Sequence, residues 1–210
     1  MDKPRIAIAD TDVPNAFATG RTPKRSVVVV TTGLLRRLDR DELEGVVAHE
    51  LSHVAHRDVL VMTIASFTAI LAGFLVRSAM WGSMMRDRRD QNTALLFFAV
   101  MLVSILVYAI SYILIRALSR YRELGADRGA AYVTGRPSAL ARALQKISGD
   151  MAAIPTQDLR KMEPVSSFAF APAFSRGRGG LGLESLMSTH PSLEKRLAQL
   201  AKISTELGER

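Results

Sequence analysis

Two long runs of uncharged, mostly apolar residues dominate the pattern of hydrophobic and polar positions. The first covers 18 residues, 59–76, and ends at Arg77, and the second covers 23 residues, 93–115, and ends at Arg116. A helix of about 20 apolar residues crosses roughly 30 Å of hydrocarbon. The pattern therefore predicts a helical hairpin through a bilayer. The alternative that it leaves is a pair of buried core helices in a soluble protein.

Short strands and a helix are predicted before the first apolar run. In residues 5–9 (Arg-Ile-Ala-Ile-Ala) isoleucine alternates with alanine, and residues 26–32 are mostly β-branched. Both patterns are typical of strands. We expect residues 27–30 to offer an edge to an extended substrate. Asp39 followed by Glu42 resembles a capping box, which predicts the start of a helix that leads into the first apolar run.

The second apolar run is expected to continue as a helix, because no strong breaker occurs before residues 135–137, Gly-Arg-Pro. Further helices are predicted over residues 138–148 and after Pro191. The charged residues 86–90 are expected to connect the two apolar runs. Residues 155–182, rich in proline, glycine and serine, are predicted to form a surface loop.

Composition and charge exclude several classes of protein. The 210 residues suffice for one ordinary core, and 48% hydrophobic residues are too many for a disordered chain. The absence of cysteine excludes disulfides, cysteine-ligated metals and a thiol nucleophile. The net charge of +8 arises mainly after residue 115, in fifteen basic and nine acidic side chains. This basic region lacks the aromatic residues that are interleaved with basic ones in nucleic-acid binders, so no nucleic-acid partner is expected.

The segment His-Glu-Leu-Ser-His at residues 49–53 is the clearest candidate for chemistry. Residues four apart lie about 40° apart around a helix, so His49 and His53 can bind one zinc ion while Glu50 lies beside it. Glu50 is then placed to take a proton from a water that the metal activates. A solvated polar helix face is the alternative, which the apolar residues on both sides of the motif disfavour.

A catalytic zinc needs a third protein ligand, and His56, His190 and a carboxylate are the candidates. His56 follows His49 by seven residues, which places it about 10 Å away along a straight helix. That distance is too long for the two side chains to share a tetrahedral site with His53. We therefore expect His56 to be a surface residue, or to support the site from outside it.

Glu123 is the better candidate for the third ligand. A hairpin of two spans returns the chain to the side that it left, so the residues before the first span and after the second emerge together. His53 lies about 9 Å of helix before the first run and Glu123 about 12 Å after the second. Asp127, one turn beyond Glu123, is suited to accept the outer N–H of a ligand histidine.

Further ordered motifs lie along almost the whole chain. They comprise residues 15–20 (Asn-Ala-Phe-Ala-Thr-Gly), residues 32–35 (Thr-Gly-Leu-Leu), Arg57-Asp58, residues 119–127, and residues 188–191 (Ser-Thr-His-Pro) with Arg196. Together with the helix over residues 41–53, they resemble the HtpX family of bacterial membrane zinc endopeptidases, which are relatives of the CAAX prenyl endopeptidases. Members of that family usually carry two further spans before the region of Asn15, and this chain begins just short of it.

The resemblance implies a gluzincin-like site. One zinc ion per chain would be held by His49, His53 and Glu123. Glu50 would act as the general base, and Asp127 would lie behind a ligand histidine.

Three further residues are given roles by the same resemblance. His190 would lie near the scissile carbonyl, where an N–H could stabilise the oxyanion of the tetrahedral intermediate. Asn15 would lie near the substrate cleft, where its amide could hold the substrate backbone. Arg196 is expected to pair with a carboxylate and so brace the site.

The expected fold class is α+β and mainly helical, a gluzincin-like zinc protease domain interrupted by a transmembrane hairpin of two helices. Residues 1–58 would form the N-terminal half of the catalytic domain and residues 59–115 the hairpin. Residues 116–210 would form the C-terminal half, with the third ligand, the loop and the terminal helix.

The implied function is that of a membrane-anchored zinc endopeptidase. We expect it to span the inner (plasma) membrane, with its site facing the cytoplasm, membrane lipid around it, and misfolded membrane proteins or unfolded polypeptides as substrates. One alternative is a CAAX-type prenyl-protein endopeptidase, which would need a large enclosed chamber that two short spans do not build. The other is an inactive zinc-binding adaptor that holds membrane clients. Glu50 disfavours the adaptor, because a structural zinc site closes with a fourth ligand and needs no base.

Overall fold

The structure is a computed structural model that describes residues 3–84, 91–153 and 189–209. Within these ranges the chain is mainly helical with a small sheet near its N-terminus, which confirms the predicted α+β class. The predicted connection at residues 86–90 and the predicted loop at residues 155–182 lie outside the described residues. The division into catalytic halves and hairpin stays a prediction.

The sheet has three strands, β1 (Arg5–Ala9), β2 (Ala16–Thr19) and β3 (Val27–Thr31), in the order β1-β3-β2. Strand β1 runs parallel to β3, and β2 runs antiparallel to it. The expectation that residues 27–30 offer an edge is therefore wrong, because β3 is paired on both sides. Strand β2 is the edge that lies next to the helices.

The described helices follow the predicted order. They are α1 (Thr32–Arg37), α2 (Arg40–Ala55), α3 (Asp58–Met84), α4 (Gln91–Thr134), α5 (Pro137–Ala153) and α9 (Leu193–Leu207). The capping box at the start of α2 is present, because the Asp39 side chain accepts a hydrogen bond from the Glu42 N–H and the Glu42 side chain accepts one from the Asp39 N–H. A short 3-10 turn, η1 (Pro23–Arg25), precedes β3.

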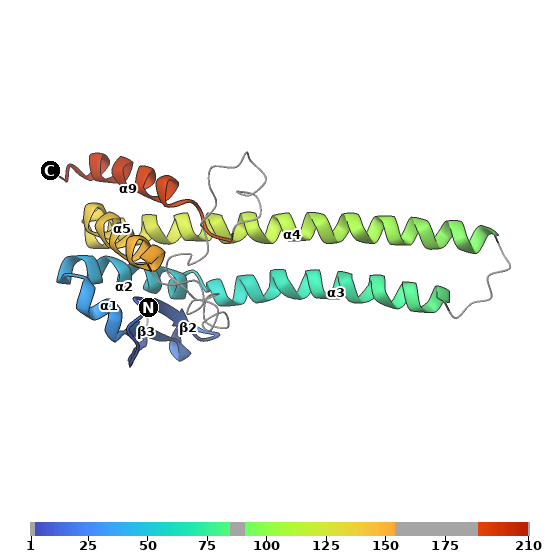
Figure 1. Cartoon of the computed structure of the whole chain (residues 1–210), viewed down its shortest axis with the longest axis horizontal. Helices are drawn as coiled ribbons and strands as arrows, with labels where there is room; N and C mark the ends of the chain where they lie inside the picture. Colours follow the sequence, from blue (N-terminus) through green and yellow to red (C-terminus); the bar gives the residue numbers. More distant parts are fainter. Residues whose placement is uncertain (1–2, 85–90, 154–188, 210) are drawn as a thin grey trace.

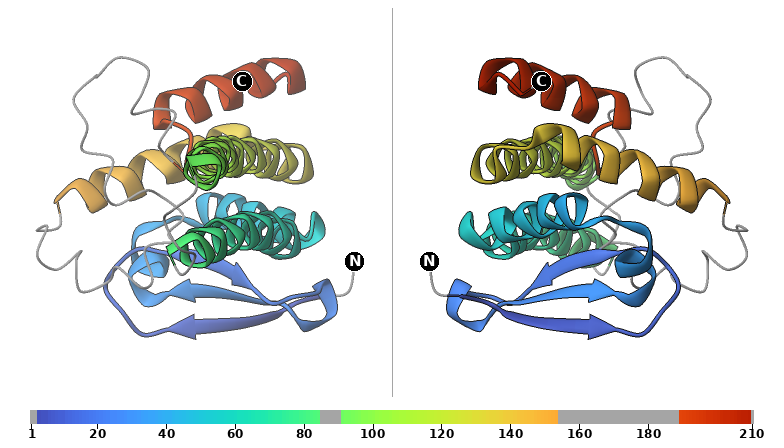
Figure 2. Two further views of the ribbon diagram at one scale, coloured as in Figure 1. Left: turned by 90° about the vertical axis from the view of Figure 1, so that its right-hand side faces the viewer. Right: turned by 90° about the vertical axis from the view of Figure 1, so that its left-hand side faces the viewer.

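The elements stack in layers, as Figures 1 and 2 show. The sheet covers one face of α2. Helices α4 and α5 pack against the opposite face of α2, and α9 covers α4 and α5. The core contains Val28, Leu34, Val46, Leu140 and Leu200, which come from the sheet and from four of the helices. Helix α2 is thus held from both sides, which fixes the residues that it carries.

Helices α3 and α4 run side by side away from these layers and form the long arm in Figure 1. The segments Asp58–Ser78 and Phe98–Thr134 are long and apolar enough to cross a membrane. No residue in the most apolar window of either segment is buried against the rest of the chain. Core helices of a soluble protein would be buried, so the structure does not support that alternative.

A sharp turn separates α2 from α3. Arg57 adopts a left-handed backbone conformation with φ 55°, which side chains other than glycine rarely adopt. The turn ends α2 at Ala55 and starts α3 at Asp58, so the two helices do not merge into one. Asp58 is consequently directed back toward the last turn of α2.

The close approach between the sheet region and α1 generates a prediction. A Cβ atom at Gly33 would lie 2.2 Å from the backbone oxygen of Asp12, whereas a Cβ at the exposed Gly149 of α5 would meet nothing within 4 Å. Gly33→Ala should therefore destabilise the protein by about 1–3 kcal/mol through overpacking. Gly149→Ala should leave its stability equal or slightly higher. Melting temperatures of both variants in detergent would test this, and equal melting temperatures would contradict it.

Candidate metal centre

Helix α2 brings three functional side chains to one buried face. His49 and Glu50 are 1% and 5% exposed, and His53 lies one turn further on the same side. The two imidazole rings stand nearly perpendicular, at 87°, with centroids 4.8 Å apart. Their Nε2 atoms lie 3.1 Å from one another, so both rings present the same nitrogen to one point.

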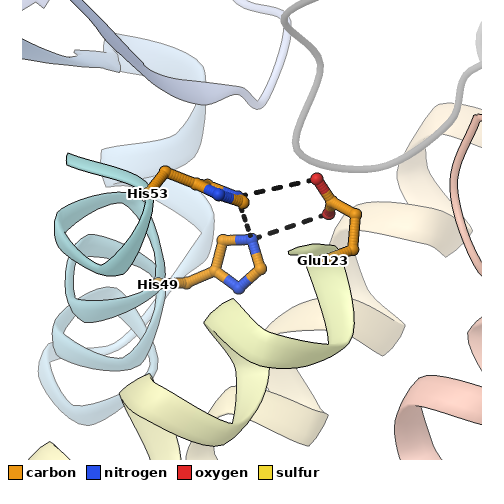
Figure 3. A group of neighbouring side chains, drawn as sticks. All are labelled: His49, His53 and Glu123. Carbon is orange, nitrogen blue, oxygen red and sulfur yellow. Dashed lines mark hydrogen bonds and ion pairs between the residues drawn. The ribbon is translucent and has the colours of Figure 1, made fainter. Parts of the chain in front are cut away.

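Helix α4 supplies the carboxylate that completes this group. Glu123 Oε2 lies 3.7 Å from His49 Nε2, and Glu123 Oε1 lies 3.5 Å from His53 Nε2. Figure 3 shows the two histidines on one helix facing the carboxylate from the neighbouring helix. The structure thus brings together the three residues that the sequence nominates as ligands, across 70 positions of sequence.

The spacing of these atoms fits a tetrahedral metal ion. Ligand atoms at about 2.0–2.2 Å from a zinc-like ion in a tetrahedron lie roughly 3.3–3.6 Å apart. One ligand atom from each of the three residues can be chosen so that all lie within 4.8 Å of one another. Two imidazole nitrogens and one carboxylate leave one tetrahedral position for a reactant, as in catalytic rather than structural zinc sites.

A buried chain of charges orients His49. Asp127 Oδ1 lies 2.9 Å from His49 Nδ1, and Arg196 on α9 donates two hydrogen bonds to Asp127, at 2.7 Å from Nε and 2.6 Å from Nη2. Asp127 and Arg196 are 0% and 2% exposed. The predicted pairing of Arg196 with a carboxylate is therefore present. A carboxylate at Nδ1 keeps the proton there and leaves the Nε2 lone pair for a metal.

A matching chain orients His53, and the sequence reasoning missed it. Asp58 Oδ2 lies 2.5 Å from His53 Nδ1, and Arg122 Nη2 lies 2.9 Å from the same oxygen. Arg57-Asp58 had been noted as a motif, but nothing in the spacing of five residues indicates that Asp58 folds back onto His53. The left-handed turn at Arg57 makes this contact possible.

The electrostatics of the site favour a bound cation. Burial alone would lower the pKa of His49, but the carboxylates of Asp127 and Glu123 outweigh it and raise the pKa to about 9. Burial lowers the pKa of His53 in spite of its hydrogen bond with Asp58. The carboxylates therefore draw positive charge to the point where the two Nε2 atoms meet.

Glu50 lies beside this group and is held by the sheet. Its Oε2 accepts a hydrogen bond from the backbone N–H of Ala18 at 2.9 Å, on the edge strand β2. Burial, more than the nearby Glu123 charge, raises the pKa of Glu50 to about 7. No sequence pattern indicates this contact, because strand pairing and helix packing together create it.

A cavity of about 680 Å³ opens at the centre. Its lining includes Glu50, His53 and Glu123 on one side and Phe17 and Ala18 of β2 on another. The candidate metal ligands therefore line a cavity of the size that ordinary ligand sites have.

The remaining nominated residues lie at different distances from the centre. His190 lines the cavity, with its Nδ1 3.5 Å from Glu123 Oε2. Asn15 is buried just before β2, where its backbone N–H donates to the Thr31 hydroxyl at 2.9 Å, and it does not line the described cavity. Its role toward substrate stays a prediction. His56 is exposed at the end of α2, as expected.

Residues 1–204 match the profile described as Peptidase family M48. A protein named "Protease HtpX homolog 1" from Streptomyces coelicolor is 59% identical over 209 residues, which are 100% of this chain and 68% of that protein. "Protease HtpX homolog 2" from Methanosarcina acetivorans is 53% identical over 208 residues, 99% of this chain and 69% of that one. The matched stretches cover the whole of α2 and α4, which carry the candidate metal ligands.

The fold is also similar to a solved structure, the "Crystal Structure of S. mikatae Ste24p", with a TM-score of 0.59. The two sequences are 21% identical, and the match covers 95% of this chain and 47% of that one. The chain thus spans just under half of the Ste24p structure. At this identity the comparison supports the fold.

The chain of charges behind His53 generates a prediction. Asp58→Ala should weaken the binding of a divalent metal by about 10–100-fold, because His53 loses the acceptor that fixes its ring. Asp58→Asn, which keeps an oxygen acceptor, should lose less. Titration with Co²⁺, followed by its visible absorbance, would measure the affinity without any substrate.

Asp41→Ala is the matched control for this prediction. Asp41 is an exposed carboxylate in the first turn of α2 that pairs with Arg136 at the surface. Its removal should leave the Co²⁺ affinity unchanged. An Asp58→Ala protein that folds and binds Co²⁺ as tightly as the wild type would contradict the orienting role.

Proposed function

Because this chain belongs to peptidase family M48, with HtpX-type proteases among its relatives, we propose that it is a zinc-dependent endopeptidase anchored in a membrane by α3 and α4. The observation that carries the proposal is the convergence of His49, His53 and Glu123 on one point beside the buried Glu50. A zinc ion held there would supply a Lewis acid that lowers the pKa of water in its open position toward about 7 and polarises a carbonyl.

Glu50 would move the proton during peptide hydrolysis. Its carboxylate lies in the cavity, next to the candidate ligands, and is fixed by the Ala18 N–H. It would accept a proton from the attacking water and give it to the leaving nitrogen, so that one group serves as base and then as acid. Because the edge strand β2 holds Glu50, the carboxylate would lie close to a substrate bound along that strand.

His190 would stabilise the charge that develops on the carbonyl oxygen. Like Glu50, it lines the cavity, and it lies near Glu123, just before the start of α9. A ring N–H directed at the oxyanion would lower the barrier more than it improves substrate binding, because the charge exists only in the transition state. The extended backbone of the substrate would pair with β2, the edge strand that contributes to the lining of the cavity.

The membrane setting follows from the hairpin. Both ends of the hairpin lie on the same side as the catalytic layers, so the centre would sit at the membrane surface, where α3 begins (Figure 1). We propose the inner (plasma) membrane with the centre in the cytoplasm. We further propose misfolded or damaged membrane proteins and unfolded polypeptides as substrates. Support for these assignments comes from the resemblance to the HtpX family and from the exposed apolar faces of α3 and α4.

Replacement of the proposed base separates hydrolysis from metal binding. Glu50→Gln should reduce casein hydrolysis in detergent by at least about 10²–10⁴-fold, because no group remains to take the proton. It should still bind about one zinc ion per chain, because the three ligands are intact. Glu44→Gln, an exposed residue on the same helix, is the control and should keep wild-type activity.

Zinc content and hydrolysis together decide between the proposal and an inactive adaptor. If wild type and Glu50→Gln both bind zinc and neither cleaves casein, the adaptor is favoured. If wild type cleaves casein and loses this activity with a chelator, and zinc restores it, the endopeptidase is favoured. Equal cleavage by wild type and Glu50→Gln would overturn the assignment of the base.

His190→Gln tests oxyanion stabilisation. It should lower kcat by about 10²–10³-fold while KM changes little, because the interaction forms mainly in the transition state. His56→Gln, at the exposed end of α2, should leave both parameters unchanged. A change confined to KM would assign His190 to ground-state binding.

A further inference from the structure

The cavity at the metal centre continues along α3, beyond the residues that would carry out hydrolysis. Its lining includes a set of residues from the first turns of this helix, which we name the α3 wall: Val59, Leu60, Met62, Thr63, Ser66, Phe67 and Ile70. Ile70 lies about 18 Å along the helix from Asp58, at 1.5 Å per residue. Asp58 in turn contacts the candidate ligand His53. The cavity is thus several times longer than one peptide bond.

The α3 wall is uncharged and largely apolar. Phe67 and Ile70 are 63% and 69% exposed, although both belong to the candidate span Asp58–Ser78. The Thr63 hydroxyl donates to the backbone oxygen of Val59 at 2.7 Å, so this polar group is satisfied within its own helix. The wall therefore offers apolar contacts at a depth where the surroundings are hydrocarbon.

The opposite end of the same cavity has a different character. It contains the charged side chains of Arg57 and Arg122 together with Glu50 and the candidate ligands. The edge strand β2 closes this end, and its Ala18 N–H already holds Glu50. One continuous cavity thus joins a polar reaction centre to an apolar wall.

We propose that the α3 wall is a specificity subsite that binds an apolar, membrane-embedded segment of the substrate polypeptide next to the bond to be cut. The continuity of the cavity points to this occupant, because a substrate polypeptide whose peptide bond lies beside Glu50 has room for the neighbouring residues along α3. About 18 Å accommodates roughly five residues of extended chain. This inference rests on the proposed endopeptidase function, and it assigns the preference of the enzyme for apolar substrate sequence to the α3 wall.

Three fluorogenic peptides test the subsite in detergent micelles. They share a casein-derived sequence that the wild type cleaves, and they carry five serines on both sides, five leucines on the N-terminal side, or five leucines on the C-terminal side. One of the two leucine peptides should have a kcat/KM at least tenfold above that of the serine peptide. In Phe67→Ala/Ile70→Ala this preference should fall to about twofold or less, because each large apolar contact is worth roughly a factor of ten.

Phe74→Ala/Leu75→Ala is the matched control for the double variant. Both residues are exposed on α3, at 64% and 60%, but neither lines the described cavity. The control should keep the wild-type preference. An equal loss of preference in the two double variants would overturn the subsite, because general hydrophobicity of the span would then explain the result.

Crosslinking reports the occupant without hydrolysis. The preferred peptide with photoleucine in its leucine block, bound to Glu50→Gln, should crosslink to residues 59–70. Crosslinks elsewhere, with an unchanged preference in Phe67→Ala/Ile70→Ala, would overturn the proposal and leave lipid as the occupant of the wall. If the wild type cleaves no peptide, the endopeptidase function fails, while the crosslinks still decide whether a polypeptide lies on the wall.

Discussion

The buried ion pair between Arg196 and Asp127 is the interaction on which the centre depends. It connects α9 to α4, and through Asp127 it reaches His49 on α2. Loss of one partner from such a buried pair typically costs about 3–5 kcal/mol, because the other charge stays desolvated. The pair is retained although burying two charges is unfavourable in itself. The pair positions the Asp127 carboxylate at Nδ1 of His49, which fixes the imidazole ring. An apolar side chain in place of Asp127 would offer the ring no hydrogen bond.

The hairpin is part of the centre as well as the proposed membrane anchor. Its first helix begins with Asp58, which orients His53, and its second helix carries both Arg122 and Glu123. The two candidate ligand histidines are therefore held by equivalent chains, in which an arginine contacts an aspartate that contacts the ring. A shift of α3 relative to α4 would move Asp58, the partner of His53, relative to the candidate ligand Glu123. Metal affinity is consequently tied to how these helices pack.

Local features of this site could be predicted from the sequence, whereas long-range pairings could not. The spacing of His49 and His53, the capping box at Asp39 and the two apolar runs are properties of single helices, so periodicity predicts them. Glu123 could be found because a hairpin fixes the depth at which the chain returns. The expectation of an edge at residues 27–30 was wrong, since β1 pairs with β3 although β2 lies between them in the sequence, and β3 is therefore the middle strand. The contact of Asp58 with His53 was missed, because it depends on a rare left-handed residue at Arg57.

The position of the charges is compatible with hydrolysis of the membrane-embedded substrate segment that we propose. His49, Glu50, Glu123, Asp127 and Arg196 are buried among one another within the catalytic layers, before the uncharged part of α3 begins. The same group placed a few turns deeper would have to be desolvated in hydrocarbon, at a cost of several kcal/mol for each unpaired charge. Water is also a reactant and is scarce at that depth. For the substrate that we propose, the protease would therefore have to draw the peptide bond to the polar end of the cavity, while the apolar residues beside that bond remain along α3.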